Sequence, residues 1–244
     1  MVQDFLNFTT ASFKKTVQTN GMKQKHLIIS KLSVAASAFG GVLLGLFDAQ
    51  QAGYSHWSRR LLYFTAQSNL CLGAVNVMLL VILLRGKQNP QKWYFLKYIF
   101  TVSIVLTGLV FCLILAPFAD QSYHPWSLSN ILTHAVTPLL ALLDFALDRY
   151  PVAVGKRGAL LTLIPPLGYF LLASLLELFG VDFGRGEPYP YFFMNYRSPV
   201  GIFGVGGTRP FVMGAFYWIL LFLLTVLLVA ELLARYHVRH SQKR

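Results

Sequence analysis

Six long apolar blocks are the feature that most restricts what this chain can fold into. They cover about residues 27–47, 61–84, 95–117, 127–147, 158–179 and 210–235. Each reaches the roughly 20 residues that an α-helix needs to cross a hydrocarbon core of about 30 Å. Hydrophobic residues make up 55% of the chain and charged residues only 12%, which leaves little sequence for a separate soluble domain. The sequence therefore predicts an all-α, polytopic membrane protein whose residues 27–235 form one six-helix transmembrane bundle.

The distribution of basic residues predicts how this bundle is oriented. The net charge of +12 comes from 21 Lys and Arg residues against 9 Asp and Glu residues. Most of these cations lie in the arm 1–26, in the second and fourth connections and in the tail 236–244. Lys31 and Lys97 lie near the ends of their spans and are included with the cations of the adjoining arm and connection. Because Lys and Arg favour the cytoplasmic side, both termini are expected to be cytoplasmic. The charge is a topological signal, and no nucleic-acid partner is expected.

The connection between the fifth and sixth spans, residues 180–209, differs from the other connections. It is about thirty residues long and rich in Gly, Pro and aromatic residues, and long loops of this kind are usually functional or disordered. Its aromatic content argues against disorder. We expect an ordered cap over the outer mouth of the bundle.

Aromatic residues also flank the outer ends of the second and fourth spans. They are Tyr54, Trp57, Tyr63, Tyr123 and Trp126. Such residues commonly sit at the boundary between lipid and water, so we interpret all five as part of an interfacial belt.

Polar residues interrupt the second and fourth apolar blocks, at 65–69 and at 130–138. Counted from the outer helix ends at 1.5 Å per residue, Thr65 lies roughly 6 Å deep and His134 roughly 11 Å deep. Both stretches therefore fall in the same outer layer of the membrane. Polar groups at this depth are costly unless they pair or face a protected cavity.

The residue types in this layer are compatible with three roles. Thr65 is a candidate nucleophile and His134 a candidate base, since a threonine hydroxyl reacts only when a neighbour takes its proton. Ser68, Asn69 and Asn130 are candidates to orient the imidazole or to stabilise an oxyanion. Hydrogen bonds that merely pack helices together are the commonest role for such residues in membranes. A transport or ion pathway is the third alternative.

Asp144 does not complete a triad with this pair. It lies ten residues beyond His134, about 15 Å along a helix and on another face. We expect its carboxylate to be solvated or paired with an arginine near the inner membrane surface, and a structural role in holding the fourth helix against its neighbours is the alternative. The histidines show no metal-ligand spacing, and the chain has no dinucleotide or phosphate-binding motif, so neither a metal nor a cofactor is expected.

Three motifs together resemble a known family. They are Tyr63-Phe64-Thr65-x-x-Ser68-Asn69, His134-x-x-x-Pro138 followed by Asp144, and Pro188-Tyr189-Pro190-Tyr191-Phe192 before the last span. In order and spacing they resemble a bacterial six-span integral membrane family of unknown function. More distantly, they resemble the eukaryotic androgen-induced protein and androgen-dependent TFPI-regulating protein family.

This resemblance implies an intramembrane threonine hydrolase that cleaves fatty acid esters of hydroxy fatty acids. Thr65 is then the catalytic threonine and His134 the catalytic histidine, with membrane lipids and an acyl-chain substrate as partners. The expected location is a bacterial cytoplasmic membrane, with the site toward the outer leaflet. A non-catalytic lipid-binding or transporter-like membrane protein is the alternative, and the sequence leaves the oligomeric state open.

Overall fold

The structure of the chain is a computed structural model. It describes the backbone of residues 2–51, 54–85, 91–118, 124–147, 156–184 and 186–241. Side chains are described over the same ranges, except for residues 2–23, 156 and 237–241. Some predictions concern side chains outside the described residues. They are those for the cations of the arm before residue 24, for the cations of the tail after residue 236 and for Tyr123.

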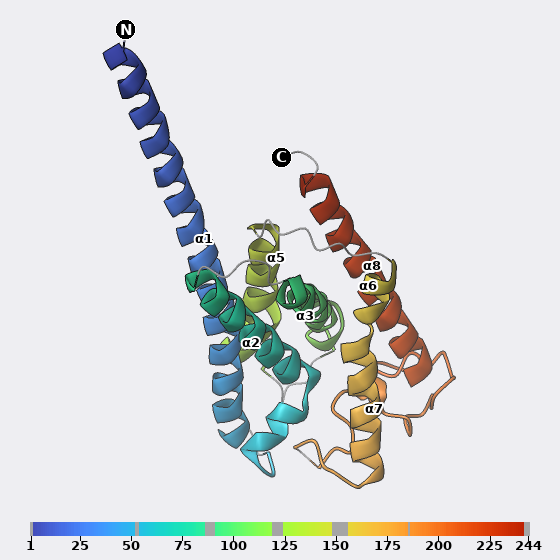
Figure 1. Cartoon of the computed structure of the whole chain (residues 1–244). Helices are drawn as coiled ribbons and strands as arrows, with labels where there is room; N and C mark the ends of the chain where they lie inside the picture. Colours follow the sequence, from blue (N-terminus) through green and yellow to red (C-terminus); the bar gives the residue numbers. More distant parts are fainter. Residues whose placement is uncertain are drawn as a thin grey trace.

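Within these ranges the chain is helical, and six helical segments are long and apolar enough to cross a membrane. They are Gln24–Gln51, Phe64–Leu84, Gln91–Leu115, Leu128–Leu147, Arg157–Leu178 and Ala215–Tyr236. The predicted all-α, six-span architecture is thereby confirmed. The first helix starts and the last helix ends at the same end of the bundle (Figure 1). That this end faces the cytoplasm stays a prediction.

Several spans are composite. The first belongs to α1 (Val2–Gln51), and a 3-10 turn, η1 (Trp57–Leu62), leads into the second, α2 (Phe64–Leu84). The third joins α3 (Gln91–Val110) to a π-helical turn, η2 (Phe111–Leu115). The fourth joins α4 (Leu128–Ile131), a second π-helical turn, η3 (Leu132–Val136), and α5 (Thr137–Leu147). The fifth comprises α6 (Lys156–Leu161) and α7 (Ile164–Leu178), and α8 (Ala215–Ser241) is the sixth.

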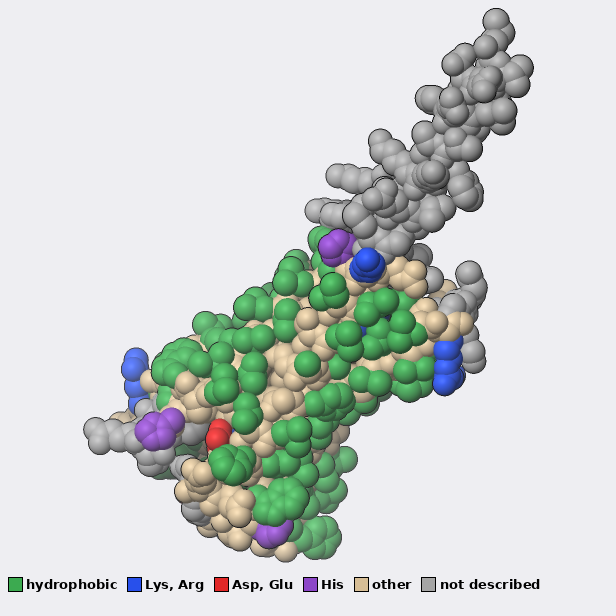
Figure 2. All heavy atoms as spheres, turned by 90° about the vertical axis from the view of Figure 1, so that its left-hand side faces the viewer, with side chains coloured by type: hydrophobic (Ala, Val, Ile, Leu, Met, Phe, Trp, Pro, Cys, Tyr) green, Lys and Arg blue, Asp and Glu red, His purple; other side chains and the backbone are tan. Residues whose placement is uncertain are grey.

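Large apolar side chains are spread over the face of the bundle that Figure 2 shows, and exposed ones occur on all six spans. They include Leu43 and Phe47 of α1, Leu113 of η2, Leu143 of α5 and Leu171 of α7, all at least 60% exposed. Aqueous solvent would oppose so much exposed apolar surface on every side. Lipid would not, so this surface supports membrane insertion independently of helix length.

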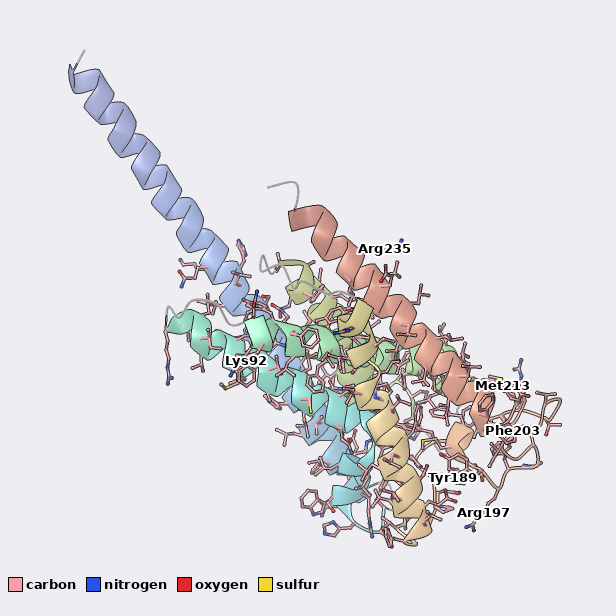
Figure 3. All side chains as sticks on the ribbon, turned by 45° about the vertical axis from the view of Figure 1, so that its right-hand side comes forward. Lys92, Tyr189, Arg197, Phe203, Met213 and Arg235 are labelled. Carbon is pink, nitrogen blue, oxygen red and sulfur yellow. The ribbon has the colours of Figure 1, made fainter. Side chains whose placement is uncertain are left out.

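The connection after the fifth span packs into the bundle. Phe183, Phe193 and Met194 are at most 5% exposed, and they join Trp218 and Phe222 of α8 in one aromatic core. A short 3-10 turn, η4 (Phe192–Met194), carries two of them. Figure 3 shows Tyr189, Arg197, Phe203 and Met213 at the end of the bundle away from Arg235. The connection is therefore held to the bundle by its own buried side chains.

Asp144 lies in an enclosed cluster of charges. Its carboxylate accepts from Ser30 Oγ at 2.6 Å and pairs with Lys31 Nζ at 3.2 Å and with Lys97 Nζ. Asp144 and both lysines are at most 1% exposed. The expectation of a solvated or arginine-paired carboxylate was wrong, and so was the placement of Lys31 and Lys97 among the loop charges. Burial at this depth requires that each charge be paired, and the pairing ties α5 to α1 and α3.

Candidate active site

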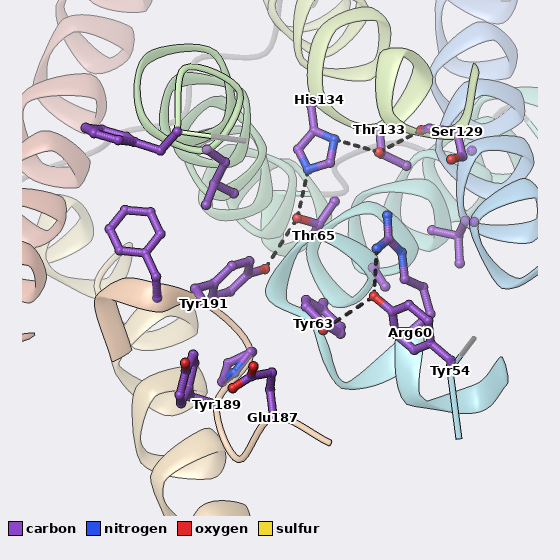
Figure 4. Close-up of a pocket in the computed structure, with 18 of the residues that line it drawn as sticks. Tyr54, Arg60, Tyr63, Thr65, Ser129, Thr133, His134, Glu187, Tyr189 and Tyr191 are labelled. Atoms are coloured by element: carbon purple, nitrogen blue, oxygen red, sulfur yellow. Dashed lines mark hydrogen bonds between the residues drawn. The ribbon is translucent and has the colours of Figure 1, made fainter. Parts of the chain in front are cut away.

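Thr65 and His134 meet inside the bundle. Thr65 stands at the start of α2 and His134 in the middle of η3. The Thr65 hydroxyl oxygen lies 3.1 Å from His134 Nε2 (Figure 4). This distance is within hydrogen-bond reach for a nucleophile and its base. The two polar stretches, widely separated in the sequence, thus contribute to one site.

The contacts around the imidazole indicate which ring nitrogen carries the proton. His134 Nδ1 lies 3.0 Å from the backbone oxygen of Asn130, which can only accept. Thr133 Oγ1 lies 3.0 Å from the same nitrogen and donates its own proton to the Ser129 carbonyl at 2.8 Å. Nδ1 therefore donates, and Nε2 presents a lone pair to the Thr65 hydroxyl. This is the tautomer that a general base requires.

Two π-helical turns shape the space around the histidine. Turn η3 carries His134, and turn η2 carries Phe111, whose ring stacks on the imidazole with centroids 4.1 Å apart and planes 22° from parallel. Pro138 has no N–H, so the His134 carbonyl lacks its usual helical donor. Within the π turn itself, the Thr137 N–H donates to the Leu132 carbonyl, five residues earlier. Turns of this kind are rare and often occur at functional sites.

A second hydroxyl approaches Thr65 from the connection after the fifth span. The Tyr191 hydroxyl lies 3.5 Å from Thr65 Oγ1. Figure 4 shows Tyr191 and His134 reaching the threonine from opposite sides. Tyr191 appeared in the sequence only as part of an aromatic loop motif. Its contact with Thr65 was missed because it joins residues that are far apart in the chain and depends on how the connection folds back.

Two of the predicted supporting residues hold helices together around Thr65. The Asn69 side-chain amide donates to the carbonyls of Thr65 at 2.8 Å and Thr133 at 3.3 Å. The Ser68 hydroxyl donates to the Thr65 carbonyl at 3.2 Å and lies 3.2 Å from the Thr107 hydroxyl. Neither Ser68 nor Asn69 lines the pocket described below. Their contacts position the threonine and leave the space in front of its hydroxyl to other groups.

Asn130 supports the histidine through its backbone. Its carbonyl accepts from His134 Nδ1, while its side chain bonds the His124 carbonyl and the Arg60 guanidinium, each at 3.0 Å. Arg60 also donates to the Tyr54 hydroxyl at 3.3 Å and lies 5.6 Å from the centroid of the Tyr63 ring. Asn130 thus connects His134, the candidate general base, with the Arg60 guanidinium, which lines the pocket.

Thr65 and His134 face a pocket of about 340 Å³. This volume lies within the usual range for small-molecule sites, near its lower end. Its apolar wall includes Val42, Leu115, Phe118 and Phe192, and its polar wall includes Arg60. The pocket therefore combines apolar surface with a cationic group beside the threonine and histidine.

A smaller cavity of about 40 Å³ lies beside the same threonine. Thr65, Leu115 and Tyr191 line both spaces, whereas Tyr169 and Phe222 line only the smaller one. The Thr65 side chain thus stands between two spaces, and the smaller one is lined mainly by apolar and aromatic residues.

The predicted aromatic belt needs a correction. Tyr54 and Tyr63 line the pocket, and Tyr63 donates to the Phe183 carbonyl at 3.1 Å. Burial, reinforced by the neighbouring Tyr54, raises the pKa of Tyr63 well above its usual value, so it remains a hydrogen-bond donor. The belt interpretation was wrong for these two residues. Trp57 and Trp126 are 44% and 69% exposed, and their place in the belt stays a prediction.

Among the described residues, no group of three or more His, Cys, Asp or Glu side chains is placed to hold a metal ion. Comparison of the chain with protein-family models, with curated proteins and with solved structures found no match. The chemistry of the site therefore has to be argued from its own residues.

Proposed function

We propose that the chain is an intramembrane threonine hydrolase that cleaves lipid esters, such as fatty acid esters of hydroxy fatty acids. The observation that carries the proposal is the 3.1 Å contact between the Thr65 hydroxyl and His134 Nε2, with Nδ1 engaged by a backbone carbonyl. A hydroxyl next to a correctly oriented imidazole is an activated nucleophile. The choice of substrate class comes from the resemblance of the sequence motifs.

The reaction proceeds in two halves. Thr65 Oγ1 attacks the ester carbonyl carbon while its proton passes to His134 Nε2. The tetrahedral intermediate then collapses, the carbon–oxygen bond to the alcohol breaks, and His134 returns the proton to the departing alcohol oxygen. Water, deprotonated by the same imidazole, then attacks the acyl-threonine carbonyl carbon. The bond from this carbon to Thr65 Oγ1 breaks, the imidazolium returns the proton to the threonine oxygen, and the fatty acid is released.

Backbone groups at the start of α2 support the negative charge of the intermediate. The first helical hydrogen bond of α2 runs from the Gln67 N–H to the Tyr63 carbonyl at 3.2 Å. The N–H groups of Thr65 and Ala66 precede it and have no carbonyl within the helix to bond. Both residues line the pocket. Helix N-termini of this kind favour anions, including an oxyanion formed beside them.

The surroundings of the site match a lipid substrate. A pocket with apolar walls inside a bundle with a lipid-compatible flank suits an acyl chain that arrives from the membrane. The pocket is lined by residues 60–66 and by the 187–192 segment, and the start of α2 lies at the end of the bundle away from the two ends of the chain (Figure 1). With cytoplasmic termini, as the Lys and Arg distribution predicts, this end faces the outer leaflet of a bacterial cytoplasmic membrane.

Substitution of Thr65 tests the proposal. Purified protein is incubated with an esterified hydroxy fatty acid, and separately with a fluorophosphonate probe. Thr65→Ala is expected to lower turnover at least about 10³-fold and to abolish labelling, because the nucleophilic oxygen is gone. Thr65→Ser keeps a hydroxyl and is expected to retain labelling. Thr225→Ala is the matched control, since Thr225 bonds only the Leu221 carbonyl of its own helix and lines neither described pocket.

Two outcomes would contradict the proposal in different ways. Full turnover or labelling of Thr65→Ala would exclude Thr65 as the nucleophile. Saturable binding of the ester, with no turnover and no labelling of the unmodified protein, would favour the alternative of a non-catalytic lipid-binding or transporter-like protein.

A further inference from the structure

We infer that Tyr191 is a further catalytic residue, whose phenol donates a hydrogen bond to the oxyanion that forms when Thr65 attacks the ester. This inference rests on the proposed hydrolase function. It assigns a chemical step to a residue of the 180–214 connection, which the sequence indicated only as a cap.

The position of the phenol carries the argument. Its oxygen lies 3.5 Å from Thr65 Oγ1, on the side of the threonine opposite His134 (Figure 4). The oxyanion is bonded to the same carbon that Oγ1 attacks, so it forms within a short distance of the threonine oxygen. A donor acts on it when the two atoms are about 2.7–3.1 Å apart. Tyr191 lines the pocket in which this carbon is bound, and therefore has access to that position.

The division of roles follows from the hydrogen-bonding capacity of each group. His134 Nε2 accepts the Thr65 proton, so it cannot also donate to the oxyanion while attack takes place. The side-chain amide of Asn69 donates to two backbone carbonyls and does not line the pocket. The Tyr191 hydroxyl, 3.5 Å from Thr65 Oγ1, and the N–H groups of Thr65 and Ala66 are donors that belong to residues lining the pocket. The phenol complements the backbone groups from across the pocket.

Ring contacts hold the phenol in place before substrate binds. The Tyr191 ring stacks on Phe193 with centroids 4.9 Å apart and planes 14° from parallel. It meets the Tyr63 ring edge-on at 5.6 Å. Phe193 is itself buried against Trp218 and Phe222 of α8. Stabilisation of a developing charge is most effective when the donor need not reorganise, and these contacts provide that rigidity.

Tyr191→Phe removes the hydroxyl oxygen and keeps the ring that makes these contacts. We expect kcat for ester hydrolysis to fall about 10²–10³-fold, as for loss of one oxyanion donor, with KM nearly unchanged. An alkyl trifluoromethyl ketone, which forms an oxyanion adduct with the nucleophile, is expected to bind more weakly by a similar factor. The fatty acid product is expected to bind equally well. Tyr196→Phe is the matched control, because Tyr196 belongs to the same connection, bonds the Ser174 hydroxyl at 2.8 Å and lines neither described pocket.

A second variant guards against a purely structural effect. Difluorotyrosine incorporated at position 191 keeps the ring and the hydroxyl but loses its proton at a lower pH. Since only the protonated phenol donates, the alkaline limb of the kcat profile should move to lower pH, a shift that altered packing would not produce.

The outcomes separate this inference from the proposed function. If turnover depends on Thr65 but Tyr191→Phe keeps kcat within about threefold of the unmodified protein, the role of Tyr191 is excluded and the hydrolase proposal stands. An unshifted pH profile for the difluorotyrosine protein excludes it as well. If Thr65→Ala hydrolyses the ester at full rate, both proposals fall together.

Discussion

At the scale of single residues, one carboxylate joins three spans. Asp144 of α5 contacts Ser30 and Lys31 of α1 and pairs with Lys97 of α3. An enclosed ion pair does not by itself show high stability, because desolvation offsets much of the attraction. Removing one partner is nevertheless damaging, since the remaining charges then lie in a medium that cannot solvate them.

Asp144→Asn is therefore expected to destabilise the protein by about 3–5 kcal/mol. Thermal unfolding in detergent, followed by helical circular dichroism, measures the effect. Glu231→Gln serves as the control, because Glu231 pairs with Arg235 at the exposed surface of α8, where such pairs contribute at most about 1 kcal/mol. Equal unfolding temperatures for both variants would show that the burial of Lys31 and Lys97 does not depend on their pairing with Asp144.

The sequence identified some residues of the site and not others, for a physical reason. Thr65 and His134 stand out because polar side chains inside apolar blocks are rare and costly. Tyr191 and Arg60 do not stand out, since aromatic and basic residues are ordinary in loops. Lys31 lies near the start of an apolar block, where a lysine normally reaches the interface. Its burial depends on a partner 113 positions away in the chain.

At the scale of elements, close helix packing places the histidine. Gly41 of α1 packs against η3: a Cβ at this position would lie 2.7 Å from Thr133 Cγ2 and 3.3 Å from the Thr133 backbone nitrogen. Gly108 of α3 similarly approaches the His134 carbonyl, at 2.9 Å from the position of such a Cβ. Two glycines therefore allow α1 and α3 to pack closely on the turn that carries the base.

Gly41→Ala and Gly40→Ala form a matched pair in adjacent positions of the same helix. Alanine favours helix by up to about 1 kcal/mol over glycine, and at Gly40 the added Cβ meets nothing within 4 Å. Gly40→Ala should therefore leave stability unchanged or slightly raised. Gly41→Ala should lower it by about 1–3 kcal/mol, as overpacking does, and should reduce ester turnover because η3 shifts. Unfolding temperature and turnover are measured on both, and equal behaviour would contradict the close packing.

The connection after the fifth span is anchored to the turn before α2 by Asp182. Its carboxylate accepts from the Ser55 hydroxyl at 2.5 Å and from the N–H groups of Gly184 and Gly186, each at 2.8 Å. Slight burial raises the pKa of Asp182, but these hydrogen bonds outweigh it and lower the pKa below its usual value. Gly184 has φ 137°, and a Cβ there would collide with the Tyr54 ring, so this turn requires glycine.

A lowered pKa in the folded state gives this anchor a defined pH dependence. Its contribution is complete above the usual carboxyl pKa of about 3.9 and is lost as pH falls through the lower folded value. Hydrogen exchange of residues 182–196, corrected for intrinsic rates, is therefore expected to be constant between pH 7 and 5 and to rise below about pH 4. Asp182→Asn should exchange faster at pH 7 with no acid-induced rise. An acid rise of the same size in the variant would assign the effect to other groups.

The six spans followed from the sequence because length and hydropathy alone define them. The π turns η2 and η3 did not, because a π turn depends on how neighbouring helices pack as well as on local residues. Pro138 indicates a break in the regular helix of the fourth span, but a proline alone does not show whether that break is a kink or a π turn. The apolar start predicted for the sixth span, near 210, precedes the observed helix because residues 210–214 belong to the irregular connection.

At the scale of the whole molecule, the two buried polar systems lie at different levels of the bundle. The Lys31–Asp144–Lys97 cluster lies near the start of the first and third spans and near the end of the fourth, whereas Thr65 lies at the start of the second span and His134 toward the start of the fourth. Apolar residues between them, among them Leu72 and Ile104, are fully buried. Polar side chains are buried at intermediate positions as well, among them Ser37 and Thr137, whose hydroxyls lie 2.8 Å apart.

The predicted orientation is testable with single cysteines. Cys71 and Cys112 are first replaced by alanine. Single cysteines are then introduced in two separate variants. Arg197→Cys lies in the exposed connection after the fifth span, and Arg85→Cys lies at the C-terminal end of α2. A membrane-impermeant maleimide added to intact cells should label position 197, and should label position 85 only after the cells are permeabilised. The reverse pattern would place the pocket on the cytoplasmic side.

The close approach of Tyr191 to Thr65 has a consequence for biosynthesis. Under the proposed mechanism, the nucleophile, the base and the oxyanion donor leave the ribosome in that order, and the donor is translated only after five spans. Its ring is then held by Trp218 and Phe222 through Phe193, so it is fixed in place only once the sixth span has been inserted. A nascent chain already embedded in the bilayer would thus remain inert toward the surrounding lipid until its synthesis is nearly complete.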